Sequence, residues 1–276
     1  MTGGTGYIGG AVAVALRNAG HEVASLARPE SETKQLRDAG VVLVSGDLES
    51  LPSLREQLGE YDAFVHAAQA AENKADADRA VLETFASFQR PLVFTTGVWI
   101  LGNAKNANEA SPANPLDLVR WRVALEESAL AAGAAVMRPG VVYGGKQSLF
   151  ADWFASAEQN RPMKIVGDGE NHWTFVHVDE LADAYVRAVE QRATGVLHAI
   201  DDTHATLTEC ARAIAPEGSI EYIPLDAARA AMGGFADALA VDQTIDSSAT
   251  REKLGWSPQK TFVNSIASQW QEWRSR

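Results

Sequence analysis

Short apolar segments alternate with helical segments through the first half of the chain, and this alternation restricts the fold more than any other feature. Runs such as HEVASLA and PLVFTTG predict strands at 21–27, 41–47, 62–68, 91–97 and 134–140. Helices are predicted between them, at 31–40, 53–59, 75–89 and 117–133. Strands that are apolar along their whole length indicate a parallel sheet covered by helices on both faces. We therefore expect an α/β fold with a doubly wound parallel sheet.

The pattern changes after Tyr143. The segment 164–178 is rich in turn residues and predicts a short pair of strands, and the helix after it is expected to begin at an Asp179 cap. Strands interleaved with helices are then expected at 195–201 and 220–225, and a last helix within 262–276.

Composition limits the function. The formal net charge is −12 and the acidic residues are dispersed, which argues against nucleic acid or an anionic membrane surface as partner. The only cysteine, Cys210, fits a reducing compartment and is expected to be a buried structural thiol. No apolar run reaches membrane-spanning length and no signal peptide precedes the first glycines, so we expect a cytoplasmic protein. The sequence predicts no metal site.

The N-terminal segment GGTGYIGG combines a turn with the start of a helix. Gly3, Gly6 and Gly9 are spaced three apart, and an apolar stripe that begins with Ile8 and Val12 follows them. A glycine-rich turn at a helix N-terminus is typical of phosphate binding, because backbone N–H groups point at the ligand and glycine allows close approach. Alone, this pattern is weak evidence.

Further motifs strengthen this interpretation. The chain resembles the extended and atypical short-chain dehydrogenases/reductases, specifically the NAD-dependent epimerase/dehydratase family. The resemblance covers nearly the whole chain and depends on TGGTGYIG (2–9), GDL (46–48), VHAA (65–68), RPGVVYG (138–144), VGDG (166–169), FVHVDELADAYVRA (175–188) and LGWSP (254–258). It implies a Rossmann domain formed by 1–145 plus about 176–200, with a smaller substrate-side lobe formed by most of 146–276.

The family carries a central strand of apolar residues before the glycines, whereas only Met1 and Thr2 stand there in this sequence. Loss of that strand leaves backbone groups of its neighbours without partners. We expect that an internal valine codon was taken as the start and that the native chain begins upstream. The alternative is that the neighbouring strands pair across the gap.

The second strand ends in SLARPE, which bears on the dinucleotide that the resemblance implies. An acidic residue at this point binds the ribose 2′-hydroxyl, whereas a neutral residue followed by arginine accommodates a 2′-phosphate. Ala27 followed by Arg28 predicts NADP, with NAD as the second choice, and the alternative is a surface arginine. The resemblance implies these cofactor-binding residues: Gly3, Thr5, Gly6, Tyr7, Ile8, Gly9, Arg28, Asp47, Leu48, Ala67, Ala68, Thr95, Arg122, Pro139 and Val142.

The family's catalytic residues are a Tyr-x-x-x-Lys pair and a serine or threonine before it, with a glutamate four positions after the lysine. If Glu126 is that glutamate, Arg122 replaces lysine and Leu118 replaces tyrosine. If it is Glu127, valines stand at both positions, so neither register supplies a tyrosine. The family's serine position falls on Gly97, one residue after Thr96.

Several residues can take over these roles. Thr96, Arg122 and Tyr143 are the predicted catalytic residues, although Tyr143 belongs to a family-typical turn and has a structural role as its alternative. The predicted substrate-binding residues are Trp99, His172 and Trp173, and the alternative for the two tryptophans is packing in the core. Trp173 stands where relatives have a substrate-binding arginine, which argues against a nucleotide sugar.

Two functions fit these residues. The first is an NADP(H)-dependent oxidoreductase or epimerase-like enzyme that acts on a small carbonyl or alcohol. The second is a catalytically inactive NADP(H) sensor or regulatory protein. The resemblance also implies a possible homodimer formed through helices at about 72–89 and 114–132.

Overall fold

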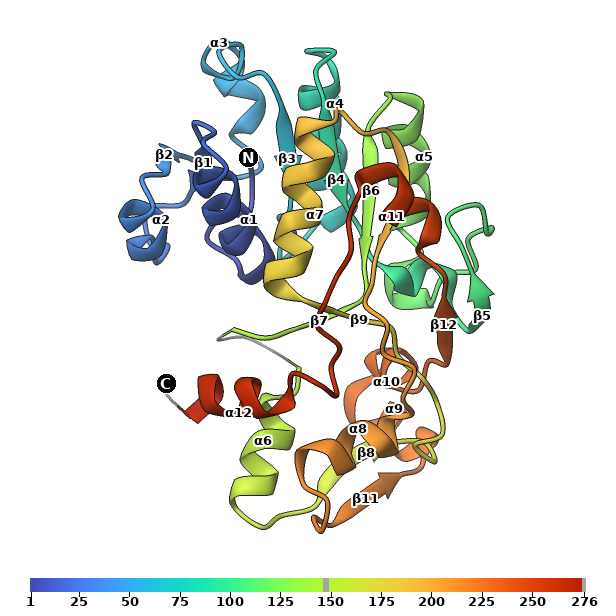
Figure 1. Cartoon of the computed structure of the whole chain (residues 1–276). Coiled ribbons are helices and arrows are strands. Elements are labelled where there is room, and N and C mark those ends of the chain that lie inside the picture. The colour runs from blue at the N-terminus through green and yellow to red at the C-terminus, as the bar shows by residue number, and fades with distance from the viewer. Residues whose placement is uncertain (146–148, 275–276) are drawn as a thin grey trace.

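The computed structural model describes residues 1–145 and 149–274. Its central sheet is parallel and has the order β10-β6-β4-β3. The four strands are β3 (Phe64–His66), β4 (Leu92–Thr95), β6 (Ala135–Pro139) and β10 (Gly195–Ala199). A second parallel pair, β1 (Ala24–Ala27) and β2 (Val42–Ser45), lies beside β3 (Figure 1). The predicted α/β fold with a parallel sheet is confirmed.

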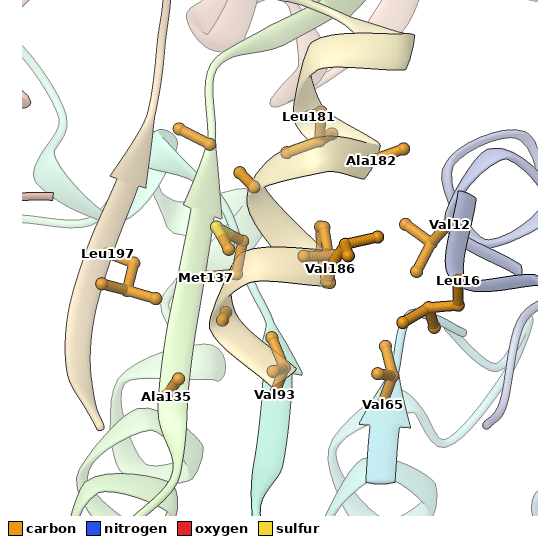
Figure 2. Close-up of a cluster of buried hydrophobic side chains, with 14 of the residues drawn as sticks. Val12, Leu16, Val65, Val93, Ala135, Met137, Leu181, Ala182, Val186 and Leu197 are labelled. Carbon is orange, nitrogen blue, oxygen red and sulfur yellow. The ribbon is translucent and has the colours of Figure 1, made fainter. Parts of the chain in front are cut away.

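Helices cover both faces of the sheet (Figure 1). Helices α1 (Tyr7–Asn18) and α7 (Val178–Glu190) cover one face, and α4 (Lys74–Ala86) and α5 (Arg122–Ala131) cover the other. Alternate residues of β4 explain this arrangement, because Val93 packs toward α1 and α7 while its neighbours Leu92 and Phe94 pack toward α4 and α5. Figure 2 shows Val12 and Leu16 of α1 and Val186 of α7 meeting the sheet.

Short elements complete this half of the chain. They are α2 (Lys34–Asp38), α3 (Arg55–Leu58), β5 (Ala104–Ala107) and the 3-10 turns η1 (Leu51–Leu54), η2 (Val98–Leu101) and η3 (Asp117–Val119). None of the helices within 1–145 and 149–274 is long and apolar enough to cross a membrane.

Met1 and Thr2 occupy the position between β1 and β3. The Thr2 N–H donates to the Val65 carbonyl at 3.0 Å, and the Leu26 N–H donates to the Met1 carbonyl at 3.0 Å. The two strands do not pair with each other, so the expected alternative of pairing across the gap is not seen. At the amino ends of β1 and β3 the sheet instead contains a cavity of about 550 Å³, which we call the slot.

The smaller lobe contains parallel pairs formed by distant parts of the chain. Strand β7 (Val141–Tyr143) pairs with β9 (Phe175–His177), and β8 (Met163–Val166) pairs with β11 (Ile220–Ile223). At its edge β12 (Gln243–Ile245) pairs with β5. Its helices are α6 (Ala151–Glu158), α8 (Leu207–Ile214), α9 (Leu225–Met232), α10 (Phe235–Leu239) and α12 (Ile266–Arg274). Helix α11 (Ser248–Leu254) instead packs against β10 and α7 of the main sheet. Cys210 is buried here as expected, and burial raises the pKa of its thiol to about 12.

Two local predictions are wrong. The segment 164–178 does not form a strand pair, because β8 and β9 each pair with a strand outside it. The helix expected to begin at an Asp179 cap begins at Val178, and its cap is His177, whose side chain accepts a hydrogen bond from the Asp179 N–H at 3.2 Å. The chain does return to the main sheet here, through α7 and β10.

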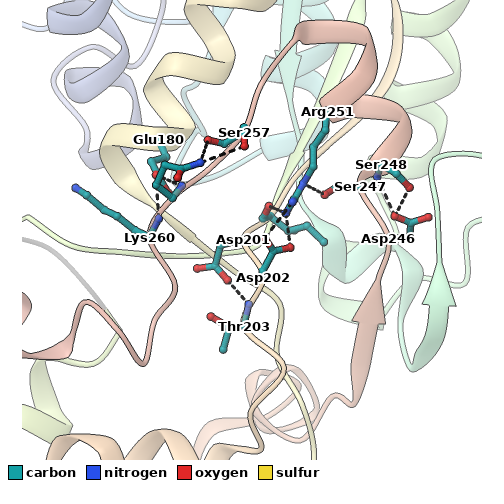
Figure 3. Close-up of polar contacts among 12 residues, drawn as sticks. Glu180, Asp201, Asp202, Thr203, Asp246, Ser247, Ser248, Arg251, Ser257 and Lys260 are labelled. Carbon is teal, nitrogen blue, oxygen red and sulfur yellow. Dashed lines mark hydrogen bonds and ion pairs between the residues drawn. The ribbon is translucent and has the colours of Figure 1, made fainter.

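Polar contacts fix the segments that pass between the lobe and the sheet (Figure 3). Arg251 donates to both carboxylate oxygens of Asp202, at 2.7 and 3.1 Å. The Glu180 carboxylate of α7 accepts from the backbone N–H groups of Gln259 and Lys260 at 2.6 and 3.1 Å. These contacts hold the lobe against the carboxyl end of the sheet.

Candidate functional site

The glycine turn packs directly against the loop after β3. Gly3 has a φ of +83°, and a Cβ on it would lie 2.4 Å from the Ala67 carbonyl oxygen. A Cβ on Gly9 would lie 2.1 Å from the Gly3 carbonyl oxygen, so neither position tolerates a side chain. The first turn of α1 contains no acidic residue, and its N-cap is Gly6. An exposed helix start of this kind fits a dinucleotide diphosphate.

A cleft of about 520 Å³ opens beside this turn, at the carboxyl ends of the strands. Seven of the predicted site residues line it: Tyr7, Ile8, Thr96, Trp99, Arg122, Pro139 and Val142. Its wall also includes residues that the sequence did not single out for this role, and most of them are apolar: Gln69, Lys74, Gly97, Val98, Leu118, Val119, Trp121, Gly140, Val141 and Leu149. Leu118 and Leu149 are 40% and 48% exposed, so the cleft presents free apolar surface to a ligand.

Arg122 lies on the wall of this cleft and is held from behind. Its guanidinium donates to the Thr95 carbonyl at 3.2 Å and to the Gln69 side-chain oxygen at 2.9 Å. The Asp78 carboxylate lies 4.0 Å away and is fully buried. Burial lowers the pKa of Arg122, and the negative charge of Asp78 opposes this effect. Arg122, rather than Val123, therefore faces the cleft, as the register based on Glu126 requires.

A buried polar chain leads from Asp78 to the start of the glycine turn. The ring of His66 places one nitrogen 3.3 Å from the Asp78 carboxylate and the other 2.7 Å from the Thr2 hydroxyl. Asp78, His66 and Thr2 are fully buried. These side chains thus form a row of buried polar groups between the glycine turn and Arg122, in which Thr2 and His66 share a hydrogen bond and the contacts of Asp78, at 3.3 and 4.0 Å, are not hydrogen bonds.

A second polar chain begins at Thr96. The Thr96 hydroxyl donates to Glu126 Oε1 at 2.5 Å, and the carboxylate of Glu126 also accepts hydrogen bonds from two nitrogens of Arg138. Glu126 is 3% exposed and Arg138 is 5% exposed. His198 lies 3.5 Å behind Arg138, and burial lowers the pKa of this histidine. One residue of the chain, Thr96, lines the cleft, and the others lie behind it.

Three predicted site residues lie elsewhere. Tyr143 is fully buried and its hydroxyl donates to Asp201 at 2.9 Å, and burial together with that carboxylate raises the pKa of Tyr143. Trp173 is 5% exposed and packs in the core of the smaller lobe. His172 lies 3.1 Å from Asp242 and lines a separate cavity of about 130 Å³. The structure therefore does not bring these three side chains to the cleft.

The residues predicted to contact the adenosine end lie after β1 and β2. Arg28 is exposed, and its guanidinium lies 3.2 Å from the Glu30 carboxylate. Asp47 is exposed, and the N–H and hydroxyl of Ser50 hold the pKa of its carboxyl below the usual value. Leu48 packs against the core, and Thr5 is exposed. The Arg28 side chain is accessible to a ligand.

Sequence reasoning missed four charged or polar residues behind the cleft: His66, Asp78, Glu126 as a hydrogen-bond partner, and Arg138. A signal was present, because His66 and Arg138 interrupt runs that are otherwise apolar, in FVHAA and AVMRPG. A charged residue inside a buried strand requires a partner, and that requirement points to a polar network.

The fold, the glycine turn and the cleft define a dinucleotide-binding α/β protein. The model of the NAD dependent epimerase/dehydratase family matches residues 1–89 and 121–200. The chain belongs to this family.

Among curated proteins, the chain is 29% identical to an uncharacterized protein of Schizosaccharomyces pombe, over 97% of both chains. It is 26% identical to the 2-alkyl-3-oxoalkanoate reductase of Stenotrophomonas maltophilia, over 71% of this chain and 66% of that protein.

Solved structures share the fold at low identity. A human epimerase family protein with NADPH is 19% identical, with a TM-score of 0.80 and 98% of each chain covered. MoeE5 in complex with UDP-glucose and NAD is 20% identical, with a TM-score of 0.80, 99% of this chain and 97% of that chain covered. A nicotinamide dinucleotide is therefore the cofactor that the family and fold support.

Proposed function

We propose that the protein is a cytoplasmic NADP(H)-dependent oxidoreductase that acts on a small, uncharged, largely apolar carbonyl compound or the corresponding alcohol. The observation that carries this proposal is the cleft, which places Trp99, Leu118, Leu149 and other apolar side chains beside the glycine turn and Arg122. When bound, the dinucleotide supplies or accepts a hydride. The chain holds it through the glycine turn and Arg122, and directs the substrate toward Thr96.

The apolar cleft favours this substrate class over a nucleotide sugar. Its described wall carries two cationic side chains, Lys74 and Arg122, and Arg122 already bonds to the protein. Trp173, which stands where relatives have a diphosphate-binding arginine, is buried in the core. The similarity to a 2-alkyl-3-oxoalkanoate reductase supports a substrate that carries a keto group next to apolar chains.

The test uses ethyl benzoylacetate, an uncharged aryl ketone ester, with NADPH. We expect oxidation of NADPH at a rate that depends on the ester concentration, and no calorimetric heat on addition of UDP-glucose. Binding of UDP-glucose without turnover of any ketone would contradict the proposed substrate class.

The sensor function is the second candidate, and one observation favours it. Neither register supplies a tyrosine at the family's catalytic position, and Tyr143 is fully buried. Tight binding of NADPH, with no oxidation in the presence of ethyl benzoylacetate or other uncharged ketones, would support this candidate over the enzyme.

The NADP preference is tested at Arg28. Its exposed guanidinium can leave Glu30 and pair with a 2′-phosphate, and a charge-assisted hydrogen bond contributes about 1.5–3 kcal/mol. Arg28→Ala should weaken NADPH binding by about 10- to 100-fold and leave NADH binding nearly unchanged. Arg37→Ala, at an exposed arginine of α2, is the matched control. Equal affinities of the wild type for NADPH and NADH would count against this role.

A further inference from the structure

We propose that Glu126 exchanges the proton of the reaction with the substrate oxygen through the hydroxyl of Thr96. This inference rests on the proposed oxidoreductase function, and it names the proton-handling groups that the family pattern does not supply here. Thr96 is the group that touches the substrate, and Glu126 acts from behind it.

Two hydroxyl groups line the described wall of the cleft, those of Tyr7 and Thr96. The Tyr7 hydroxyl donates to the backbone carbonyl of Gly144 at 2.5 Å, a group that does not take up a proton. The Thr96 hydroxyl donates to a carboxylate, Glu126, which does. Thr96 is thus a hydroxyl through which the cleft communicates with a buried carboxylate.

The geometry leaves the Thr96 oxygen able to accept a hydrogen bond from the hydroxyl of a substrate alcohol. Because its own hydrogen is directed at Glu126, its lone pairs can accept a hydrogen bond from a hydroxyl in the cleft. The result is a chain of two hydrogen bonds, one from the substrate to Thr96 and one from Thr96 to Glu126.

Arg138 makes this arrangement stable inside the protein. A lone carboxylate with 3% exposure would be strongly disfavoured, but the Arg138 guanidinium binds both oxygens of Glu126. Glu126 is not part of the cleft wall, and Thr96 lies between the two. The ion pair thus keeps an acid–base group one side chain away from the substrate.

The step balances in both directions. In alcohol oxidation the carbinol carbon loses a hydride to the oxidised dinucleotide, and the substrate O–H proton passes to Thr96 while the proton of Thr96 passes to Glu126. A carbonyl double bond forms, and once the ketone has left, Glu126 returns the proton through the Thr96 hydroxyl to water in the cleft. In reduction Glu126 first takes a proton from water in the cleft through Thr96, and both transfers reverse once the ketone is bound. Threonine keeps one proton throughout, so no free alkoxide of Thr96 is required.

The test compares Thr96→Val, Thr96→Ser and Glu126→Gln with the wild type in the reduction of ethyl benzoylacetate by NADPH. General acid–base catalysis contributes about 100-fold or more, so Thr96→Val and Glu126→Gln should each lower kcat by about that factor. NADPH affinity should change by less than about twofold, and Thr96→Ser should retain most of kcat, since it keeps the hydroxyl. The double variant should be no slower than either single variant, because both interrupt one relay.

Glu127→Gln is the matched control, since Glu127 is the exposed neighbour of Glu126 on the same helix. Removing the Glu126 charge leaves Arg138 unpaired and can unfold the protein, and the Thr96 variants cover that case because they leave the ion pair intact.

A second measurement does not depend on turnover. Calorimetry of the alcohol product, ethyl 3-hydroxy-3-phenylpropanoate, with the protein free of dinucleotide should show about tenfold weaker binding to Thr96→Val, the value of one hydrogen bond. Glu126→Gln should bind the alcohol as the wild type does, because its side-chain oxygen still accepts from Thr96.

The outcomes separate this inference from the proposed function. Turnover by the wild type with an unchanged kcat in folded Thr96→Val or Glu126→Gln overturns the relay and leaves the oxidoreductase function standing. No turnover by the wild type overturns both. Loss of kcat in both Thr96→Val and Glu126→Gln, with rescue in Thr96→Ser and an unchanged kcat in Glu127→Gln, supports both.

Discussion

At the scale of single residues, the cleft is supported by two buried ion pairs, Arg122–Asp78 and Arg138–Glu126. Removing such charges from water costs several kcal/mol per ion, and only close partners offset that cost. Both pairs lie at the carboxyl end of the sheet, where the substrate is expected. Apolar residues would pack at these positions at lower free-energy cost, so we attribute the charged pairs to a role beside the cleft, namely to hold charged groups next to it.

Arg122→Ala should both destabilise the protein and weaken cofactor binding. It removes the guanidinium that lies 4.0 Å from the fully buried Asp78 carboxylate, which should lower the free energy of unfolding. Loss of one hydrogen bond to the nicotinamide ribose should weaken NADPH binding by about tenfold. Urea unfolding and calorimetry measure the two effects, and Arg120→Ala, at the exposed arginine paired with Asp117, is the control. Unchanged NADPH affinity would remove Arg122 from the site.

The sequence predicted which residue types surround the site better than it predicted their contacts. The glycine turn, Thr96, Trp99 and Arg122 were all found from local motifs, and all lie at the cleft or beside it. Tyr143 was not placed correctly relative to the cleft, because the motif RPGVVYG does not reveal that its tyrosine donates to Asp201, 58 residues further along the chain. Partners at that separation are set by the tertiary fold.

At the scale of elements, periodicity found the strands of the main sheet but not the pairing in the smaller lobe. Strands β3, β4 and β6 lie within the apolar runs at 62–68, 91–97 and 134–140. Strands β8 and β9 were assigned to each other because they are adjacent in sequence, but their partners come from elsewhere in the chain. Short strands carry little information about their partners, since the pairing depends on the packing of the whole lobe.

The slot between β1 and β3 leads to a prediction about a strand added to the chain. A variant with about five apolar residues fused ahead of Met1 should place them in the slot, paired with both strands, and gain several kcal/mol of stability from burial. The slot wall supports this, since it includes Leu16, Phe64 and Val65. Urea unfolding measures the gain.

The control for this variant is an extension of the same length made of glycine and serine. It removes the charge of the Met1 ammonium equally but has no apolar side chains to bury. If both extensions stabilise the protein to the same extent, filling of the slot is not the cause.

At the scale of the whole molecule, assembly can be predicted from the face that α4 and α5 form together. The two helices pack side by side, and α5 exposes Leu130 at 36% among mainly polar neighbours. This mixed surface favours a weak homodimer rather than an obligate one. Light scattering should give a dimer mass at high micromolar concentration that decreases on dilution. A monomer mass across that range would contradict the prediction.

The dependence of stability on pH follows from buried groups in both parts of the molecule. The Met1 ammonium lies between β1 and β3, and burial lowers its pKa to about 5 from 8.0. Burial also lowers the pKa of His198. Both groups bind more protons in the unfolded chain, so stability should be lost as the pH falls from about 8 to about 5.

Other buried groups affect the dependence of stability on pH, both at low pH and at high pH. Burial raises the pKa of Asp201, so the contribution of this carboxyl to stability is largest at low pH and is lost as the pH rises through its raised pKa. It therefore partly offsets the stability that Met1 and His198 lose in acid.

Burial raises the pKa of Cys210 above its ordinary 9.0 and the pKa values of Tyr143 and Tyr185 above their ordinary 10.0, so stability should fall again as the pH rises beyond about 9. Urea unfolding should therefore show a maximum between about pH 8 and 9. Acetylation of the Met1 amine should flatten the slope between about pH 5 and 8, and a slope that is unchanged by acetylation would show that this amine is not its source.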